Sequence, residues 1–136
     1  METDFGRWAE EGNLHHASWI ARAKLAAQYI PDYSKVLDLG CGAMYLKNFL
    51  PPHVVYVGSD LIDRDGTTLV CDYNRGELPS PSVRYDVVTL LGVLEYIADP
   101  NHFLRSLRRY DADLLFTYTL ADGMSLEYRA SLGWIN

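Results

Sequence analysis

The sequence contains no apolar run that approaches the ~20 residues of a membrane-spanning helix. Its first five residues are acidic overall and lack the basic and apolar regions of a secretory signal. The two cysteines, Cys41 and Cys71, are too few for a disulfide framework and do not have the spacing of metal ligands. These absences predict a cytoplasmic protein with no metal site and no membrane partner.

The sequence also contains fewer basic than acidic residues. Twelve Lys and Arg residues stand against eighteen Asp and Glu residues, so the formal net charge is -6. A net anion does not favour unspecific binding to nucleic acid or to an anionic membrane surface. With 136 residues, 49% of them hydrophobic, the chain is long enough for one domain with its own core and too short for two.

Helical and strand-like segments alternate along the chain. Apolar residues with helical spacing run over residues 14–30, and Pro31 ends that pattern. Short β-rich runs follow at residues 35–39, 54–60, 67–71, 86–91 and 114–118. Further helices are predicted over residues 43–50, after the Asp99-Pro100 pair and over residues 124–132, whereas the segment 61–66 is too short for a helix.

The strand-like runs are continuously apolar, which is typical of parallel strands that are buried on both faces. Strands that alternate with helices through right-handed crossovers form an open, doubly wound α/β sandwich. Ligands of such sheets bind beyond the carboxyl ends of the strands. The residues directly after each strand are therefore the candidates for a functional site.

A glycine-containing loop follows the first strand. Gly40 and Gly42 allow the backbone to turn sharply and a ligand to approach it closely. A dinucleotide fingerprint requires a third glycine where Tyr45 stands, and the Gly-Lys-Ser/Thr sequence of a phosphate-binding loop is absent. Asp38, beside the loop, would repel a pyrophosphate and favours a ligand with positive charge.

Two further carboxylates lie at the ends of the next two strands. Asp60 stands eighteen residues after Gly42, where a carboxylate accepts hydrogen bonds from a ribose diol. Asp72 can accept a hydrogen bond from an adenine amino group, with Tyr73 beside it. Each of these residues taken singly is as often structural as functional, but their joint order and spacing predict a site for a nucleoside with a cationic tail.

These residues resemble the motifs of class I S-adenosylmethionine-dependent methyltransferases, in the small-molecule, methyltransferase-11-like branch. The resembling segments are residues 36–42, 58–60, 71–73 and 85–100, and the match spans residues 35 to about 118. The resemblance implies a three-layer Rossmann-like sandwich with a mostly parallel sheet of strand order 3-2-1-4-5. It also implies S-adenosylmethionine as cofactor and S-adenosylhomocysteine as product.

The resemblance assigns the methionine moiety to Asp38 and the loop backbone, the ribose to Asp60, and the adenine to Asp72. The expected cofactor-binding residues are Asp38, Gly40, Cys41, Gly42, Asp60, Leu61, Asp72, Tyr73, Leu91 and Gly92. Methyl transfer needs mainly alignment and exclusion of water, and a general base only if the acceptor must lose a proton. Candidates for such a base are Glu95, Tyr96, Tyr118 and Thr119, although Glu95 and Asp99 are more simply interpreted as helix-start charges.

Three features depart from the family pattern. Met44 stands where the family usually has a third glycine, the helix between the second and third strands is nearly deleted, and the closing antiparallel strands are missing. We expect a single methyltransferase-like domain with an N-terminal helical segment (1–33), a cofactor-binding core (34–120) and an incomplete C-terminal end (121–136). We also expect either that the natural chain is longer or that a second copy covers the exposed sheet edge as a homodimer.

The prediction is an S-adenosylmethionine-dependent methyltransferase that acts on a small-molecule acceptor. The departures favour an alternative, a catalytically silent methyltransferase-like module for binding or assembly. Tyr45 argues against a second alternative, a nicotinamide-dependent oxidoreductase. No Asn/Asp-Pro-Pro-Tyr/Phe motif follows the fourth strand, which argues against amino-methylation of nucleic-acid bases.

Overall fold

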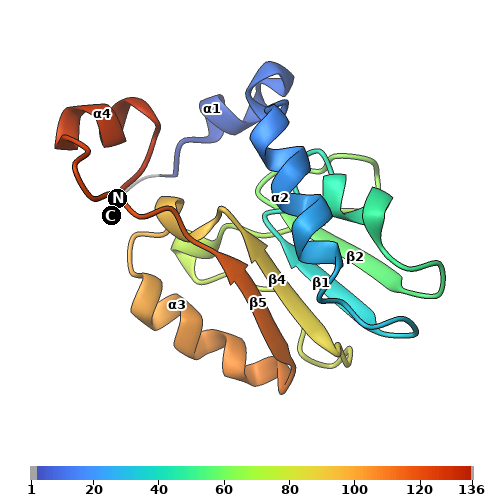
Figure 1. The fold of residues 1–136 in the computed structure, drawn as a ribbon. Coiled ribbons are helices and arrows are strands. Elements are labelled where there is room, and N and C mark those ends of the chain that lie inside the picture. The colour runs from blue at the N-terminus through green and yellow to red at the C-terminus, as the bar shows by residue number, and fades with distance from the viewer. Residues whose placement is uncertain (1–2, 136) are drawn as a thin grey trace.

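The computed structural model describes residues 3–135 as an α/β fold built on one sheet. Five parallel strands follow one another in the order β3-β2-β1-β4-β5 (Figure 1). Their bounds are Lys35–Leu39 (β1), Val55–Asp60 (β2), Leu69–Val70 (β3), Val87–Leu91 (β4) and Asp113–Thr117 (β5). The predicted fold class and strand order are confirmed, and every described strand is parallel. Residues 1, 2 and 136 of the predicted terminal segments lie outside the described residues.

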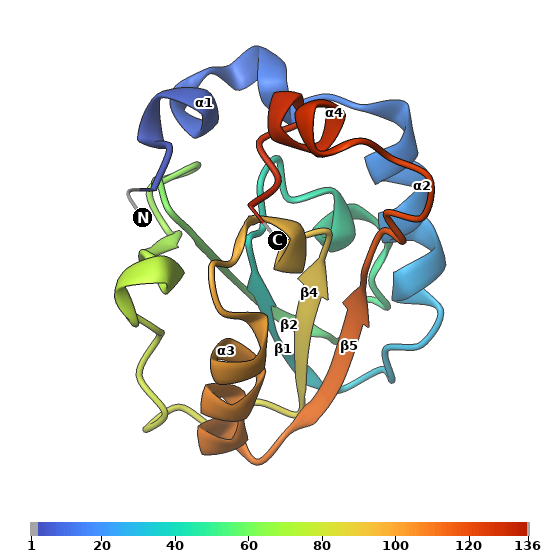
Figure 2. The same ribbon diagram turned by 90° about the vertical axis from the view of Figure 1, so that its left-hand side faces the viewer.

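Helices cover both faces of the sheet. Helix α2 (Ala17–Ala27) packs on one face and α3 (Pro100–Ser106) on the other, which gives three layers (Figures 1 and 2). The Asp99 carboxylate accepts a hydrogen bond from the His102 backbone N–H at 2.9 Å and so caps α3 as predicted. Two shorter helices, α1 (Phe5–Ala9) and α4 (Leu126–Ser131), lie beyond the carboxyl ends of the strands (Figure 2).

The hydrophobic core has one part on each face of the sheet. On the face of α2, residues Ala23, Ala26, Ala27 and Ile30 pack with Val36, Leu46 and Val87. On the face of α3, residues Phe103 and Leu107 pack with Leu37, Leu39, Val88 and Leu90. Neighbouring strand residues thus point into opposite parts of the core, which explains why the central strands read as continuous apolar runs.

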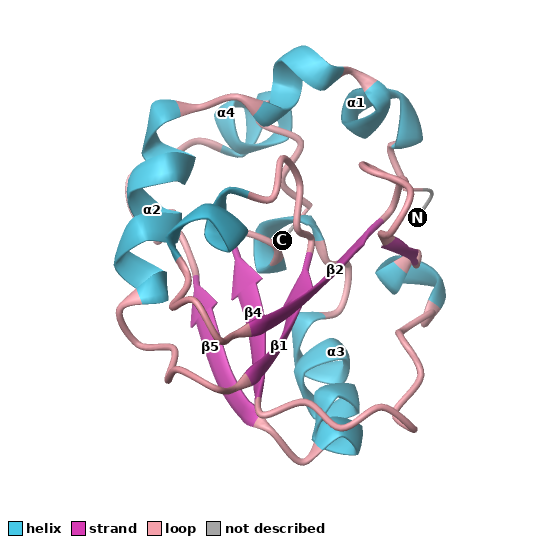
Figure 3. Cartoon of the chain, turned by 90° about the vertical axis from the view of Figure 1, so that its right-hand side faces the viewer, coloured by secondary structure: helices cyan, strands magenta, loops and turns pink. Residues whose placement is uncertain are grey.

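The segment after the glycine loop differs from the prediction. A helix was expected over residues 43–50, but the structure forms only a 3-10 helix at Tyr45–Phe49. Met44 precedes it with a φ of 58°, in the left-handed region that favours glycine. A helix with right-handed backbone angles cannot run through this residue, so the segment is shortened. The connection between β2 and β3 contains no helix, as predicted, and is drawn as loop in Figure 3.

Strand β5 forms one edge of the sheet. Within residues 3–135 it pairs with β4 alone, and the side chains of Leu114 and Phe116 are 40% and 48% exposed. An exposed apolar edge of this kind is open to pairing with another chain. The homodimer expected through this edge therefore stays a prediction.

Candidate functional site

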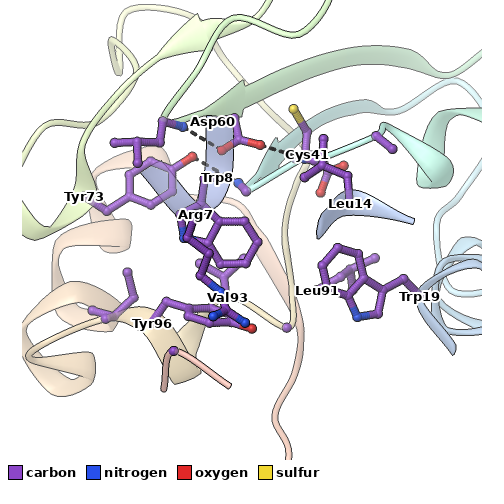
Figure 4. Close-up of a pocket in the computed structure, with 18 of the residues that line it drawn as sticks. Arg7, Trp8, Leu14, Trp19, Cys41, Asp60, Tyr73, Leu91, Val93 and Tyr96 are labelled. Carbon is purple, nitrogen blue, oxygen red and sulfur yellow. Dashed lines mark hydrogen bonds between the residues drawn. The ribbon is translucent and has the colours of Figure 1, made fainter. Parts of the chain in front are cut away.

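A cavity of about 180 Å³ opens at the carboxyl ends of the strands (Figure 4). This volume is more than ten times the ~10–15 Å³ that one water molecule requires. The cavity is lined by all ten residues that were predicted to bind the cofactor, namely Asp38, Gly40, Cys41, Gly42, Asp60, Leu61, Asp72, Tyr73, Leu91 and Gly92. Residues that are spread over more than fifty positions of the sequence thus share one hollow, because parallel strands end on the same side of the sheet.

The glycine loop is held tightly against β2. The backbone N–H groups of Gly40 and Cys41 donate to the carbonyl of Ser59 at 2.8 and 3.0 Å. Gly40 has a φ of 71°, and a Cβ there would lie 2.5 Å from Cγ2 of Val93. Glycine is therefore required at this position, both by the backbone conformation and by the close approach of Val93 in the loop after β4.

Asp60 joins the glycine loop to the end of β2. One carboxylate oxygen, Oδ2, accepts from the Gly42 backbone N–H at 2.8 Å and from Arg64 Nε at 3.2 Å. The other oxygen, Oδ1, accepts from the Leu61 backbone N–H at 2.6 Å. The carboxylate is therefore fixed in orientation at the place where the sequence predicts a ribose.

Asp38 is a buried carboxylate at the floor of the cavity. It accepts hydrogen bonds from Thr89 Oγ1 and from the Tyr56 hydroxyl, both at 2.7 Å. Burial raises the pKa of Asp38 to about 6, although both hydrogen bonds act in the opposite direction. A cationic group beside this carboxylate would therefore be strongly favoured, because it would stabilise the ionised form.

Asp72 and Tyr73 close the opposite wall of the cavity. The Asp72 carboxylate caps the 3-10 helix Tyr73–Arg75 through the Asn74 backbone N–H at 3.1 Å, and it also accepts from Thr3 Oγ1 at 2.9 Å. The Tyr73 hydroxyl donates to Ser59 Oγ at 3.0 Å, and burial raises the pKa of Tyr73. Asp72 thus has a structural role as well as a place on the cavity wall.

The candidate bases are placed differently from one another. Tyr96 lines the cavity, and its ring meets the ring of Trp8 edge to face with centroids 4.8 Å apart. Burial raises the pKa of Tyr96, so its hydroxyl stays protonated at neutral pH. The Tyr118 side chain is 46% exposed and is not among the residues that line the cavity.

Glu95 is buried behind the cavity wall. Its carboxylate oxygen Oε1 accepts from the Thr119 backbone N–H at 2.9 Å and so ties the loop after β4 to the end of β5. Its backbone carbonyl accepts from the Ile135 N–H at 2.9 Å. Glu95 stands in the first turn of the 3-10 helix Leu94–Tyr96, but this contact shows that its carboxylate serves the chain beyond β5. Glu95 and Thr119 are thus joined by a hydrogen bond, and neither residue lines the cavity.

Part of the cavity wall comes from the N-terminal segment, whose residues were not among the predicted cofactor-binding residues. Arg7, Trp8, Trp19 and Arg22 line the cavity, and Figure 4 shows the two tryptophan rings facing it. The Nε atom of Arg22 is buried without a hydrogen-bond partner among the described residues. Arg22 stands three residues after Trp19, so both side chains lie on one side of α2. This spacing is the feature of the sequence from which their shared place on the cavity wall could have been predicted.

Met44 does not block the cavity. Its terminal methyl carbon lies 3.3 Å from the position that a Cβ on Gly58 would take. Met44 is not one of the lining residues. The departure from the family pattern at Met44 thus affects the start of the following 3-10 helix, through a left-handed φ of 58°, and leaves the cavity lining to other residues.

Comparisons with known proteins agree with this architecture. A family model described as methyltransferase domain matches residues 11–135. The chain belongs to this methyltransferase domain family, and its five parallel strands in the order β3-β2-β1-β4-β5 form the Rossmann-like fold of class I S-adenosylmethionine-dependent methyltransferases. Membership implies S-adenosylmethionine as the cofactor. A comparison with curated proteins gave no match.

Two solved structures share the fold. A chain from the complex between the Haloferax volcanii Trm112 methyltransferase activator and a methyltransferase is 24% identical, with a TM-score of 0.59 over 85% of the present chain. The present chain spans 59% of that chain. A SAM-dependent methyltransferase from Aquifex aeolicus is 17% identical, with a TM-score of 0.61, and the match covers 92% of the present chain and 84% of the other.

Helix length also bears on the membrane prediction. Among residues 3–135, no helix has both the length and the apolar character that crossing a membrane demands. Three or more His, Cys, Asp or Glu side chains in a metal-binding arrangement are likewise not found in this part of the chain.

Proposed function

We propose that this domain transfers a methyl group from S-adenosylmethionine to a small-molecule acceptor. The observation that carries the proposal is the convergence of Asp38, Asp60 and Asp72 with the Gly40–Gly42 loop on one cavity. The three carboxylates come from the ends of three different strands and match the cationic tail, the ribose and the adenine of an adenosyl sulfonium in that order.

The described residues fit this cofactor. Asp60 would hold a ribose hydroxyl, Asp72 the adenine amino group, and Asp38 the cationic amino group. Arg22, whose buried Nε has no partner among the described residues, supplies a positive group for the carboxylate of the methionine moiety. The cavity thus offers one group of each charge to the amino acid end of the ligand, Asp38 for its amino group and Arg22 for its carboxylate.

The bound cofactor would supply an activated methyl group on a cationic sulfur. The chain's own residues then have two tasks, orientation of the donor and exclusion of water. Asp38, Asp60 and the loop backbone orient the donor, and Trp8 and Trp19 supply apolar wall. Burial raises the pKa of Tyr96, so this hydroxyl of the cavity wall is not a base at neutral pH, and the proposal gives it no proton to take.

Calorimetric titration with S-adenosylhomocysteine tests the proposal, with NAD as the comparison ligand. We expect one ligand to bind per chain, and a hundredfold excess over Kd to add about 2.7 kcal/mol to the free energy of unfolding. NAD should give neither heat nor a shift in Tm. Absence of heat with S-adenosylhomocysteine, or equal binding of NAD, would contradict the proposal.

A silent methyltransferase-like module remains the second candidate. The buried contact between Glu95 and Thr119 and the exposure of Tyr118 favour it, because these candidate bases do not face the cavity. Binding of S-adenosylhomocysteine without methyl transfer to any acceptor in a panel of small thiols, amines and carboxylates would support this candidate. Turnover with any of them would exclude it.

A further inference from the structure

Arg64 connects two parts of the molecule that are far apart in the sequence. It lies in the loop between β2 and β3, four residues after Asp60, and its side chain is only 11% exposed. Its Nε donates to Asp60 Oδ2 at 3.2 Å, and its Nη1 donates to the backbone carbonyl of Trp8 at 2.9 Å. The guanidinium thus bridges the expected ribose carboxylate and helix α1, which lies 56 residues away in sequence from Arg64.

Helix α1 is held over the cavity by polar and partly buried contacts and not by the core. It contains no buried residue, so no apolar side chain anchors it in the core. Its other contacts include the Trp8 ring, which meets Tyr96, the Arg7 side chain, which lies beside Gly133, and the Arg7 carbonyl, which accepts from Asn13 Nδ2 at 2.7 Å. Just before the helix, the Thr3 hydroxyl donates to Asp72. A segment with so few buried apolar groups opens locally at low cost in free energy, and its position depends on these polar contacts.

The Asp60 carboxylate still has room for a ligand. An ionised carboxylate offers about four acceptor positions. The backbone N–H groups of Gly42 and Leu61 and the Nε of Arg64 take three of them. One position remains for a ribose hydroxyl while Arg64 stays in place, so the bridge to α1 and the ligand can be held by one carboxylate at the same time.

We propose that Arg64 is a positioning residue that tethers α1 over the nucleoside end of the cavity by way of Asp60. The proposal rests on the proposed function for its ligand, and on the Trp8 and Asp60 contacts for its geometry. The planar guanidinium reaches both acceptors at once, whereas a lysine ammonium is a point charge that reaches one of them. The tether therefore depends on the fork of donors and not on the charge alone.

The test compares Arg64→Lys and Arg64→Gln with the unaltered chain and with Arg84→Gln, a matched control at an exposed arginine. The first measurement is amide hydrogen exchange of residues 3–9 in the ligand-free protein, with the amides of β1 and β4 as the internal standard for global stability. Both Arg64 variants should exchange about tenfold faster in residues 3–9, as expected for the loss of a hydrogen bond from a charged group. The Arg84→Gln control should be unchanged. The strand amides exchange through global unfolding and so report the stability that is lost with the Asp60–Arg64 pair, whereas residues 3–9 exchange through local opening of α1.

The second measurement is the affinity for S-adenosylhomocysteine and, where an acceptor is known, the kinetic constants. Both Arg64 variants should raise Kd and the donor KM about tenfold and leave kcat unchanged, because α1 holds the donor and does not take part in the reaction.

Two results would overturn the proposal. Unchanged exchange of residues 3–9 in Arg64→Gln would show that Arg64 does not hold α1. If Arg64→Lys had the same exchange of residues 3–9 and the same Kd as the unaltered chain, a positive charge beside Asp60 would be sufficient and the fork of donors would not be needed. If the unaltered chain does not bind S-adenosylhomocysteine, the proposed function fails, and the exchange measurement still decides whether the tether exists.

Discussion

Replacement of Asp60 by alanine is expected to weaken the binding of S-adenosylhomocysteine by about 1.5–3 kcal/mol, or roughly 10–150-fold. The loss arises because a ribose hydroxyl loses a charged acceptor that the Gly42 and Leu61 backbone N–H groups hold in a fixed orientation. Calorimetric titration well below the Tm measures the effect on the folded protein.

The same substitution is expected to lower stability. Asp60 and Arg64 form an ion pair whose side chains are 12% and 11% exposed, and removal of the acid leaves a buried guanidinium without its partner. Breaking such a buried pair costs about 3–5 kcal/mol in the free energy of unfolding, measured by urea denaturation. Asp60→Asn keeps the shape and one acceptor oxygen, so its losses in both measurements should be smaller. An unchanged Kd in Asp60→Ala would remove this residue from the binding site.

Ligand binding is expected to strengthen by about tenfold between pH 5 and pH 7 because of Asp38. The pKa of this carboxyl is raised from 3.8 to about 6 by burial. The cationic amino group of S-adenosylhomocysteine favours the ionised form, so binding below the pKa requires the loss of a proton. Calorimetry in buffers of different ionisation enthalpy should also detect this proton release at pH 5 and not at pH 7.

The free energy of unfolding of the ligand-free protein should change with pH in the direction opposite to the ligand affinity. The unfolded carboxyl titrates near 3.8 and the folded one near 6, so between these values the folded protein holds the extra proton. The contribution of Asp38 to the free energy of unfolding therefore falls as pH rises through this window, by roughly 3 kcal/mol in total. Asp38→Asn cannot ionise, and the difference between the two unfolding curves isolates the effect. Identical pH dependence of the two proteins in both binding and unfolding would contradict this role.

Much of the fold could be predicted from the sequence because the central strands carry an unambiguous pattern. The runs 36–39 and 87–90 are apolar except for Asp38 and Thr89 and are buried on both faces, and parallel topology then places the residues after them at one end of the sheet. The ten expected cofactor residues met at one cavity for that reason. Their joint location follows from topology and needs no knowledge of side-chain packing.

The parts that could not be predicted depend on contacts between distant segments. The helical pattern of residues 43–50 gave no sign that Met44 adopts a left-handed conformation and shortens the helix. No periodicity pairs Arg64 with the Trp8 carbonyl or directs the Glu95 carboxylate to Thr119. The tether of α1 and the contact of Glu95 therefore required the three-dimensional structure. The cavity residues at the ends of the strands, in contrast, could be predicted from the sequence.

A crystal structure of the protein grown with S-adenosylhomocysteine tests the central claim most directly. The account predicts an adenosine whose ribose hydroxyl contacts Asp60, whose adenine lies beside Asp72 and Tyr73, and whose amino acid end lies between Asp38 and Arg22. An empty cavity at saturating ligand, or a ligand bound elsewhere on the molecule, would contradict it.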